Sequence, residues 1–168
     1  PSTTMMRFGS RRVFSSASAA RPFASAGACG ALRRSVAYLA CSFGIVIIDL
    51  IKKEIYDTWK PGDNDRTAEV WDISFGKGNV FAATDMGLFY AGSSAQGLSY
   101  WGNWSVEKRL PCPKGNYNAV LFSGNRLYAN RSGEYFEGDS LYVIETSCTL
   151  FSFEPGVFNK SLEPGPDG

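Results

Sequence analysis

The feature of this sequence best suited to binding is a dense aromatic run, Tyr100-Trp101-Gly102-Asn103-Trp104. Indole and phenol rings stack on the faces of sugar rings, and aromatic side chains on loops often form recognition surfaces. Tyr100, Trp101 and Trp104 are therefore the candidate ligand-binding residues. The same rings would also suit the core or the packing between repeated units, and the sequence leaves both interpretations open.

Two groups of acidic residues suggest other chemistry. Asp63-Asn64-Asp65 resembles the start of a calcium loop, but the glycine and glutamate that such a loop needs further along are missing. A solvated turn between repeats is the better interpretation. Glu134, Glu137 and Asp139 could form the paired carboxylates of a glycoside hydrolase. Their glycine-rich surroundings favour exposed turn residues instead.

Much catalytic chemistry is excluded by the residue types that are absent or isolated. The chain has no histidine, the usual general base and a common metal ligand. Its four cysteines form no C-x-x-C pair, so a structural zinc site and a thioredoxin-like motif have no support. A disulfide between Cys112 and Cys148 or a set of buried free thiols remain open alternatives. We therefore predict that the chain is not an enzyme and binds no metal or cofactor.

The charge is divided unevenly along the chain. Formal net charge is +1, but all 16 acidic residues lie from Asp49 onward. That part also holds 11 of the 17 basic residues, so its formal charge is −5. It offers no basic surface for nucleic acid, and we exclude DNA and RNA as partners.

Residues 1–34 differ in composition from the rest of the chain, because they are rich in Ser, Ala and Arg and show no hydrophobic periodicity. Three interpretations compete: an Arg- and Ser-rich transit peptide, a wrongly translated start, and a basic flank before an export signal. We expect this segment to be disordered or artefactual and not to pack on the folded part.

An uncharged run, Ser35 to Ile48, follows Arg33-Arg34 and has the length of a signal-peptide core. It is too short to span a bilayer, which takes about 20 apolar residues. The turn-like Ser42-Phe43-Gly44 at its centre instead predicts two strands and a turn.

An internal repeat is the most informative pattern in the sequence. A predicted hairpin of Val36 to Ala40 and Ile45 to Leu50, with a turn ending at Gly44, recurs 43 residues later as Asn79 to Thr84 and Leu88 to Ala91. A looser third copy joins Arg126 to Asn130 with Ser140 to Ile144. Self-similarity at 40 to 50 residues is typical of propeller blades.

A second element repeats in step with the hairpins. Val70 to Phe75 precedes the second hairpin and Tyr117 to Phe122 precedes the third. A further strand pattern follows each of the first two hairpins, at Glu54 to Lys60 and Trp104 to Leu110. The repeating unit thus has four strands, ordered from inner to outer.

The predicted fold class is all-β, a partial β-propeller of consecutive four-stranded antiparallel blades. The propeller region, residues 35–150, divides into a partial blade at 36–62, a full blade at 70–110 and a third blade at 117–150. Residues 151–168 are expected to begin a further strand pair or to form a truncated tail. Because closure takes four to eight blades, we expect a fragment of a larger protein. An antiparallel sandwich or barrel is the alternative, but it would not require the repeat.

The same residues carry a family resemblance. The runs Tyr38 to Leu50, Glu54 to Trp59, Val70 to Ile73 and Ala82 to Tyr90 closely resemble the N-terminal propeller region of PorZ-like proteins. These proteins belong to the type IX secretion system of Bacteroidetes, and their propellers are similar to those of two-component regulators. The resemblance covers residues 36–150, and the Ala-Ala-Thr-Asp-x-Gly-Leu phrase is shared with other bacterial propellers.

The resemblance implies a non-catalytic binding platform in the cell envelope, exported to the periplasm or the outer-membrane surface of a Gram-negative bacterium. Its partners would be other secretion-system proteins that attach cargo, together with an envelope glycan or lipopolysaccharide. Two alternatives remain: the ligand-sensing ectodomain of a two-component regulator, and a fragment of a propeller glycosidase or polysaccharide lyase.

Overall fold

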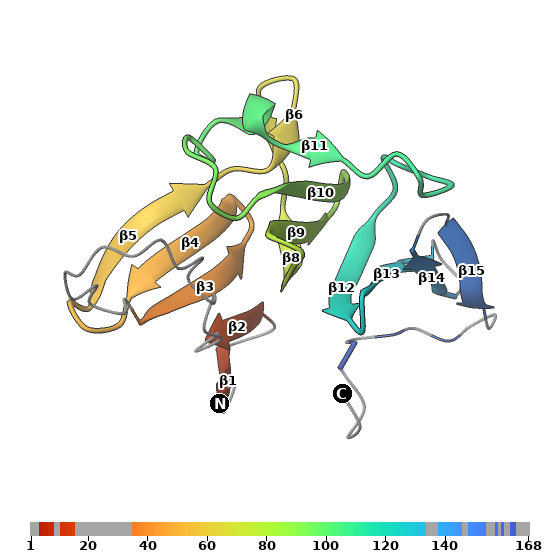
Figure 1. Ribbon diagram of the computed structural model, residues 1–168, viewed down its shortest axis with the longest axis horizontal. Helices are drawn as coiled ribbons and strands as arrows, with labels where there is room; N and C mark the ends of the chain where they lie inside the picture. The colour runs from red at the N-terminus through yellow and green to blue at the C-terminus, as the bar shows by residue number, and fades with distance from the viewer. Residues whose placement is uncertain are drawn as a thin grey trace, which may run out of the picture.

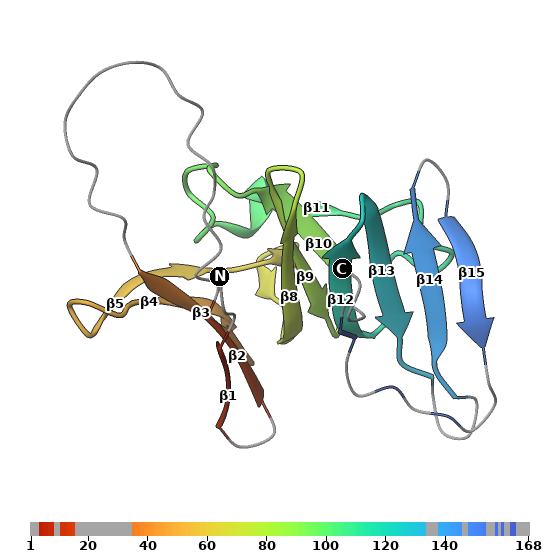
Figure 2. The same ribbon diagram turned by 60° about the horizontal axis from the view of Figure 1, so that its bottom comes forward.

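Three antiparallel sheets stand side by side in a computed structural model of the chain (Figures 1 and 2). The structure describes residues 4–8, 11–15, 35–133, 138–145, 148–153, 157, 159 and 162–163. Each sheet contains a set of four strands that follow one another in sequence and in space. The all-β partial propeller predicted from the repeat is confirmed.

The strands of the three sheets have the following bounds. The first sheet runs in the order β1 (Thr4–Phe8), β2 (Arg11–Ser15), β3 (Val36–Cys41), β4 (Gly44–Asp49) and β5 (Glu54–Trp59). The second contains β8 (Val70–Gly76), β9 (Asn79–Thr84), β10 (Gly87–Gly92) and β11 (Ser105–Val106). The third contains β12 (Tyr117–Ser123), β13 (Arg126–Arg131), β14 (Ser140–Ile144) and β15 (Cys148–Phe153).

The repeat extends to irregularities of the backbone. The innermost strand of the second blade has a register shift between Val70 and Asp72, and that of the third blade has one between Tyr117 and Ala119. The two shifts occupy equivalent places, at the start of the innermost strand of each blade. The hairpin β3–β4 of the first blade pairs in the same way as β9–β10 of the second. The second and third sheets are therefore copies of one unit, and the first sheet shares its central hairpin.

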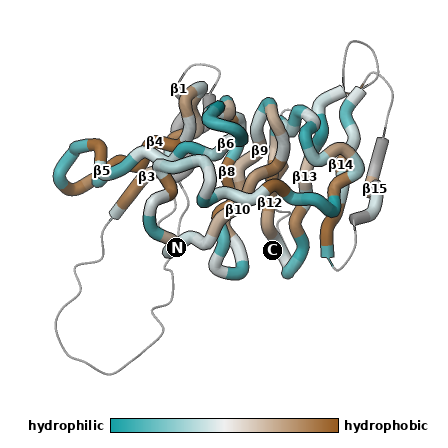
Figure 3. The backbone as a smooth tube through the Cα atoms, turned by 90° about the horizontal axis from the view of Figure 1, so that it is seen from above, coloured by the Kyte–Doolittle hydropathy of each residue, from teal (hydrophilic) through white to brown (hydrophobic). Residues whose placement is uncertain are grey.

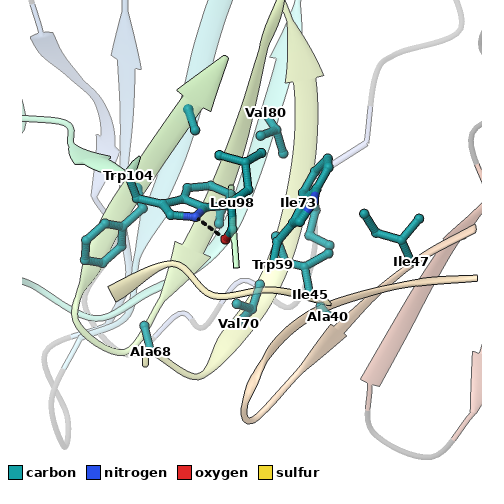
Figure 4. Close-up of a cluster of buried hydrophobic side chains, with 13 residues drawn as sticks. Ala40, Ile45, Ile47, Trp59, Ala68, Val70, Ile73, Val80, Leu98 and Trp104 are labelled. Atoms are coloured by element: carbon teal, nitrogen blue, oxygen red, sulfur yellow. Dashed lines mark hydrogen bonds between the residues drawn. The ribbon is translucent and has the colours of Figure 1, made fainter. Parts of the chain in front are cut away.

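Two hydrophobic cores fill the spaces between neighbouring sheets. Alternate residues of β9 point to opposite sides, so Val80 and Ala82 face the first sheet while Phe81 and Ala83 face the third. Figure 4 shows the first core, where the aliphatic side chains of β4 meet those of β8 and β9. In Figure 3 the hydrophobic stretches lie along the strands and hydrophilic residues gather in several turns. The middle sheet is thus covered on both faces.

Side chains of the second blade also hold the backbone of the third. The buried carboxylate of Asp72 accepts the Val120 N–H with Oδ2 at 3.0 Å. The hydroxyl of Ser74 accepts the Phe122 N–H at 2.8 Å. Both acceptors lie on β8 and both donors on β12, so the two inner strands are joined by directed hydrogen bonds as well as by packing.

Glycines allow the backbone to pass close to itself at the hairpin turns. A Cβ at Gly44 would lie 2.2 Å from the Trp59 carbonyl oxygen, and one at Gly87 would lie 2.4 Å from that of Pro113. Both residues have φ in the range that L side chains rarely adopt, +122° and +141°. The turn at Lys77 and Gly78 has positive φ at both residues, the type I′ geometry that suits a two-residue hairpin.

The structure differs from the sequence prediction at both ends of the propeller. Residues 1–34 were expected not to pack on the fold, yet β1 and β2 extend the first sheet and β2 pairs with β3. An edge strand presents unpaired N–H and C=O groups, and any extended segment can pair with them. Residues 16–34 lie outside the described residues. The division of the chain at residue 35 stays a prediction.

The third blade extends past residue 150, and the expectation that residues 151–168 begin a further strand pair or form a truncated tail stays a prediction. Cys148–Phe153 form β15, the outer strand of the third blade, paired with β14. The chain also carries a small hairpin that the sequence did not indicate, β6 (Gly62–Asp63) with β7 (Arg66–Thr67), between the first and second blades. Among the described residues, no helix is long and apolar enough to cross a membrane.

Candidate binding surface on the second blade

The predicted aromatic residues lie in the excursion between β10 and β11. A single turn of 3₁₀-helix, η1 (Trp101–Asn103), follows Tyr100, and in Figure 1 it lies beside β6. Tyr100 is 54% exposed and Trp101 is partly exposed. Their ring centroids are 5.2 Å apart at an interplanar angle of 46°. These two rings form an aromatic pair at the surface.

Gly102 lies close to the ring of Tyr100. A Cβ at Gly102 would lie 2.4 Å from the ring of Tyr100. The side chain of Asn103 donates to the Gly97 carbonyl at 2.8 Å and closes the base of the loop. The Asn103 side chain therefore constrains the backbone of the excursion.

Trp104, the third predicted binding residue, belongs to the core. It is 7% exposed, and its indole N–H donates to the Leu98 carbonyl at 3.0 Å (Figure 4). Its ring meets Trp59 of the first blade edge-to-face at 6.4 Å. The aromatic run thus splits between the two interpretations that the sequence left open, and we restrict the proposed surface to Tyr100 and Trp101.

The hairpin β6–β7 contacts the aromatic pair through Asp65. The indole N–H of Trp101 donates to Oδ1 of Asp65 at 2.5 Å. Lys114 pairs with Oδ2 of Asp63 at 2.8 Å. Asn64 and Asp65 occupy the hairpin turn, with φ of +50° and +61°. The segment considered as a calcium loop is therefore a type I′ turn whose carboxylates contact neighbouring loops.

Of the acidic residues considered for glycoside hydrolysis, Asp139 is buried and does not lie in an exposed turn. Asp139 is 2% exposed, and its carboxylate accepts hydrogen bonds from Asn130 Nδ2 at 2.7 Å and from the Asn159 N–H at 2.8 Å. It also accepts the Gly133 N–H. The Asp139 carboxylate thus connects the backbone at Gly133 with the backbone at Asn159. Glu134 and Glu137 lie outside the described residues.

A groove of about 370 Å³ separates the second and third blades at the hairpin-turn end. Its floor includes the rings of Phe81 and Phe122, which stack with an interplanar angle of 2°. Glu107 is buried at its outer end and accepts hydrogen bonds from Arg109 at 2.8 and 2.7 Å. Arg109 also donates to the Glu145 carbonyl and so connects the two blades. No pattern in the sequence indicates this arrangement.

The pKa of Glu107 follows from this pairing. Burial acts to raise it, but the hydrogen bonds and the positive charge of Arg109 outweigh burial and hold the pKa below its ordinary value. A carboxyl whose pKa is depressed by folding adds stability above its unfolded pKa, and that stability is lost as the pH falls through the folded pKa.

We therefore expect Glu107→Gln to lower the unfolding free energy by about 2 kcal/mol near neutral pH. The difference from the parent should shrink once the pH falls below the ordinary glutamate value of 4.5. Melting temperatures at about pH 7 and about pH 3 would check this. Glu145→Gln is the control, because that carboxylate is half exposed in its pair with Arg126. A Glu107→Gln deficit that is the same at both pH values would contradict the expectation.

The remaining candidate chemistry has little structural support. The Cys112 thiol is free, and the side chain of Cys148 lies outside the described part of the chain. Within the ranges that the structure describes, no three His, Cys, Asp or Glu residues gather closely enough to hold a metal ion. Tyr100 and Trp101 stay the candidate binding residues.

Comparison with known proteins agrees with the geometry. The family model of the N-terminal β-propeller domain of PorZ, a protein of the type IX secretion system, matches residues 31–105. That range includes most of the first two blades. No curated protein matches the chain.

A solved structure with the same fold is that of PorZ from Porphyromonas gingivalis, described as an essential bacterial surface component of the type IX secretion system. The two proteins are 21% identical, with a TM-score of 0.51 over 71% of this chain. The chain spans 14% of the length of that PorZ chain. The prediction of a PorZ-like β-propeller is confirmed.

Proposed function

We propose that this chain is a non-catalytic platform of a type IX secretion machinery, on which protein or glycan partners assemble while cargo is attached to the cell surface. The observation that carries the proposal is the match of residues 31–105 to the PorZ N-terminal propeller. The exposed pair of Tyr100 and Trp101 lies within that range and would supply the contact.

A binding role without catalysis is supported by how the buried acids are used. Asp72 holds the third blade, Asp139 closes a loop, and Glu107 is bound by Arg109. Each is engaged in a structural contact, and the sequence contains no histidine to serve as a general base. Stacked strands form a rigid scaffold, and the loops that they carry provide the contacts.

The partners would be other proteins of the secretion system, with an envelope glycan or lipopolysaccharide as a second class. The place of action would be the periplasm or outer-membrane surface, as for the PorZ described as a bacterial surface component. The formal charge of −5 from Asp49 onward does not suit nucleic acid.

Deletion of the gene in the bacterium that encodes it should leave type IX cargo unattached to the surface, and the parent gene should restore attachment. The double variant Tyr100→Ala with Trp101→Ala should fail to restore it while keeping the parent melting temperature, because both rings stand outside the two cores. Fractionation and immunoblotting of a cargo protein give the measurement.

Tyr56→Ala is the matched control, since Tyr56 is 55% exposed on the first blade and should be dispensable. Normal cargo attachment in the deletion strain would refute the proposed function. Hydrolysis or lyase products released from an envelope glycan by the purified protein would refute its non-catalytic part.

A further inference from the structure

A negative charge stands beside the aromatic pair without a positive partner. Asp65 is exposed, and its Oδ1 accepts the Trp101 indole N–H at 2.5 Å. That hydrogen bond leaves the charge of the carboxylate in place, because indole is a neutral donor. Two ring faces and one carboxylate are thus brought together at one point of the surface.

The neighbouring acids differ from Asp65 in how they are paired. Asp63 is bound by Lys114 at 2.8 Å, and Asp85 is 3.9 Å from Arg66. Asp65 has no ion pair among the residues that the structure describes. The groove between the blades also lacks such a group, since Glu107 pairs with Arg109 and Glu145 with Arg126. Beside the aromatic pair, Asp65 is therefore the carboxylate whose charge is left to attract an added cation.

Two aromatic rings beside a carboxylate are suited to binding a cation. Aromatic faces attract cations through the ring quadrupole, and the attraction is strongest for Trp and Tyr. A guanidinium group can stack on a ring and at the same time donate to a carboxylate. Tyr and Trp are also the residue types most enriched at energetic centres of protein interfaces.

The site is held in shape before any partner arrives. Asp65 sits in a two-residue type I′ turn, Tyr100 rests on Gly102, and the hairpin is tied to a second loop by the pair of Lys114 and Asp63. Binding to such a site loses little conformational entropy on this side of the interface.

We propose that Tyr100, Trp101 and Asp65 bind an arginine side chain of a partner protein. The proposal rests on the platform function proposed above and names the class of partner for the same surface. It favours a protein over a glycan, because an arginine side chain neutralises the carboxylate charge, whereas a neutral sugar offers only uncharged hydroxyl donors.

A peptide titration tests the proposal directly. The full chain labelled with ¹⁵N is titrated with a synthetic Gly-Arg-Gly-Arg-Gly peptide and, in parallel, with Gly-Gln-Gly-Gln-Gly. The indole resonance of Trp101, assigned with Trp101→Phe, should shift and saturate with the arginine peptide only. The indole N–H bonds Asp65 itself, so it reports on this site.

Asp65→Asn is the informative variant, because an asparagine oxygen can still accept the indole N–H while the charge is lost. We expect Asp65→Asn and Tyr100→Leu each to weaken arginine-peptide binding by about tenfold, and Tyr56→Leu to leave it unchanged. Raised salt should weaken the parent and not Asp65→Asn. Equal binding of the two peptides, or unchanged binding in Asp65→Asn, would overturn the proposal.

The outcome also separates this proposal from the proposed function. If Asp65→Asn restores cargo attachment while the double variant of Tyr100 and Trp101 does not, the platform function stands and arginine recognition fails. If neither deletion nor any variant alters cargo attachment, the proposed function fails, whatever the peptide titration shows.

Discussion

Replacing Gly87 by alanine is expected to destabilise the protein by about 3 to 4 kcal/mol. The new Cβ would lie 2.4 Å from the Pro113 carbonyl oxygen, which is backbone and cannot rotate away. The φ of +141° adds strain of about 1 to 3 kcal/mol for a non-glycine residue. The turn and the segment that leads to the third blade would have to separate. Urea unfolding followed by tryptophan fluorescence gives the measurement.

Gly78→Ala is the matched comparison for Gly87→Ala. Gly78 also has positive φ, +74°, but no heavy atom lies within 4 Å of its added Cβ. Its substitution should cost about 1 kcal/mol, from backbone strain alone. An equal loss of unfolding free energy in the two variants would show that the close approach at Gly87 does not contribute to the destabilisation.

Loss of the Asp72 carboxylate should have a similarly large effect. Asp72→Ala leaves the buried Val120 N–H without its acceptor and empties a site that is 1% exposed. Removing one partner of a buried charged hydrogen bond costs about 3 kcal/mol. Because the bond joins β8 to β12, we expect the second and third blades to lose their common unfolding transition. Differential scanning calorimetry would show a lower and broader transition.

Ser74→Ala is the control for Asp72→Ala, since Ser74 makes the neighbouring bond to Phe122 through a neutral hydroxyl. It should cost about 1 kcal/mol. If Asp72→Ala proves no more harmful than Ser74→Ala, the charged bridge between the blades is not a main source of stability.

The blades were predictable because each local signal agrees with the global fold. The hairpins at Val36–Asp49 and Asn79–Gly92 have apolar strands on both sides of a glycine turn, and they recur at a fixed spacing. The third blade is less regular. Its insertion displaces the later strands, so β15 ends at Phe153, beyond the limit that the spacing suggested.

The candidate site was predictable only in part, because burial depends on local backbone direction. Trp101 and Trp104 are identical residues three positions apart. Trp104 follows η1 in an extended conformation, with φ of −103° and ψ of 146°, and its ring lies in the core. The partner of Trp101, Asp65, is 36 residues away in the sequence. A contact of that range leaves no periodic signal.

The burial of Asp139 could not be predicted either, because it depends on contacts between residues far apart in the sequence. Glycines near it indicate a loop, and loop carboxylates are usually solvated. Its hydrogen-bond partners include Asn130 and Asn159, nine and 20 residues away. The pairing of β2 with β3 depends on an open strand edge, which composition does not reveal.

Because the middle sheet is covered on both faces, the three blades should differ in how easily they unfold locally. In a stack of repeated units, stability is close to a sum of unit terms and nearest-neighbour interface terms. Opening either outer blade breaks one interface, whereas opening the second breaks both. Amide hydrogens of β9 and β10 should therefore exchange with solvent at the slowest rates, close to those of global unfolding. The excursion with Tyr100 and Trp101 is attached to this slowest-opening sheet and contacts the first blade through Trp104 and Trp59, so opening of the third blade leaves those contacts in place.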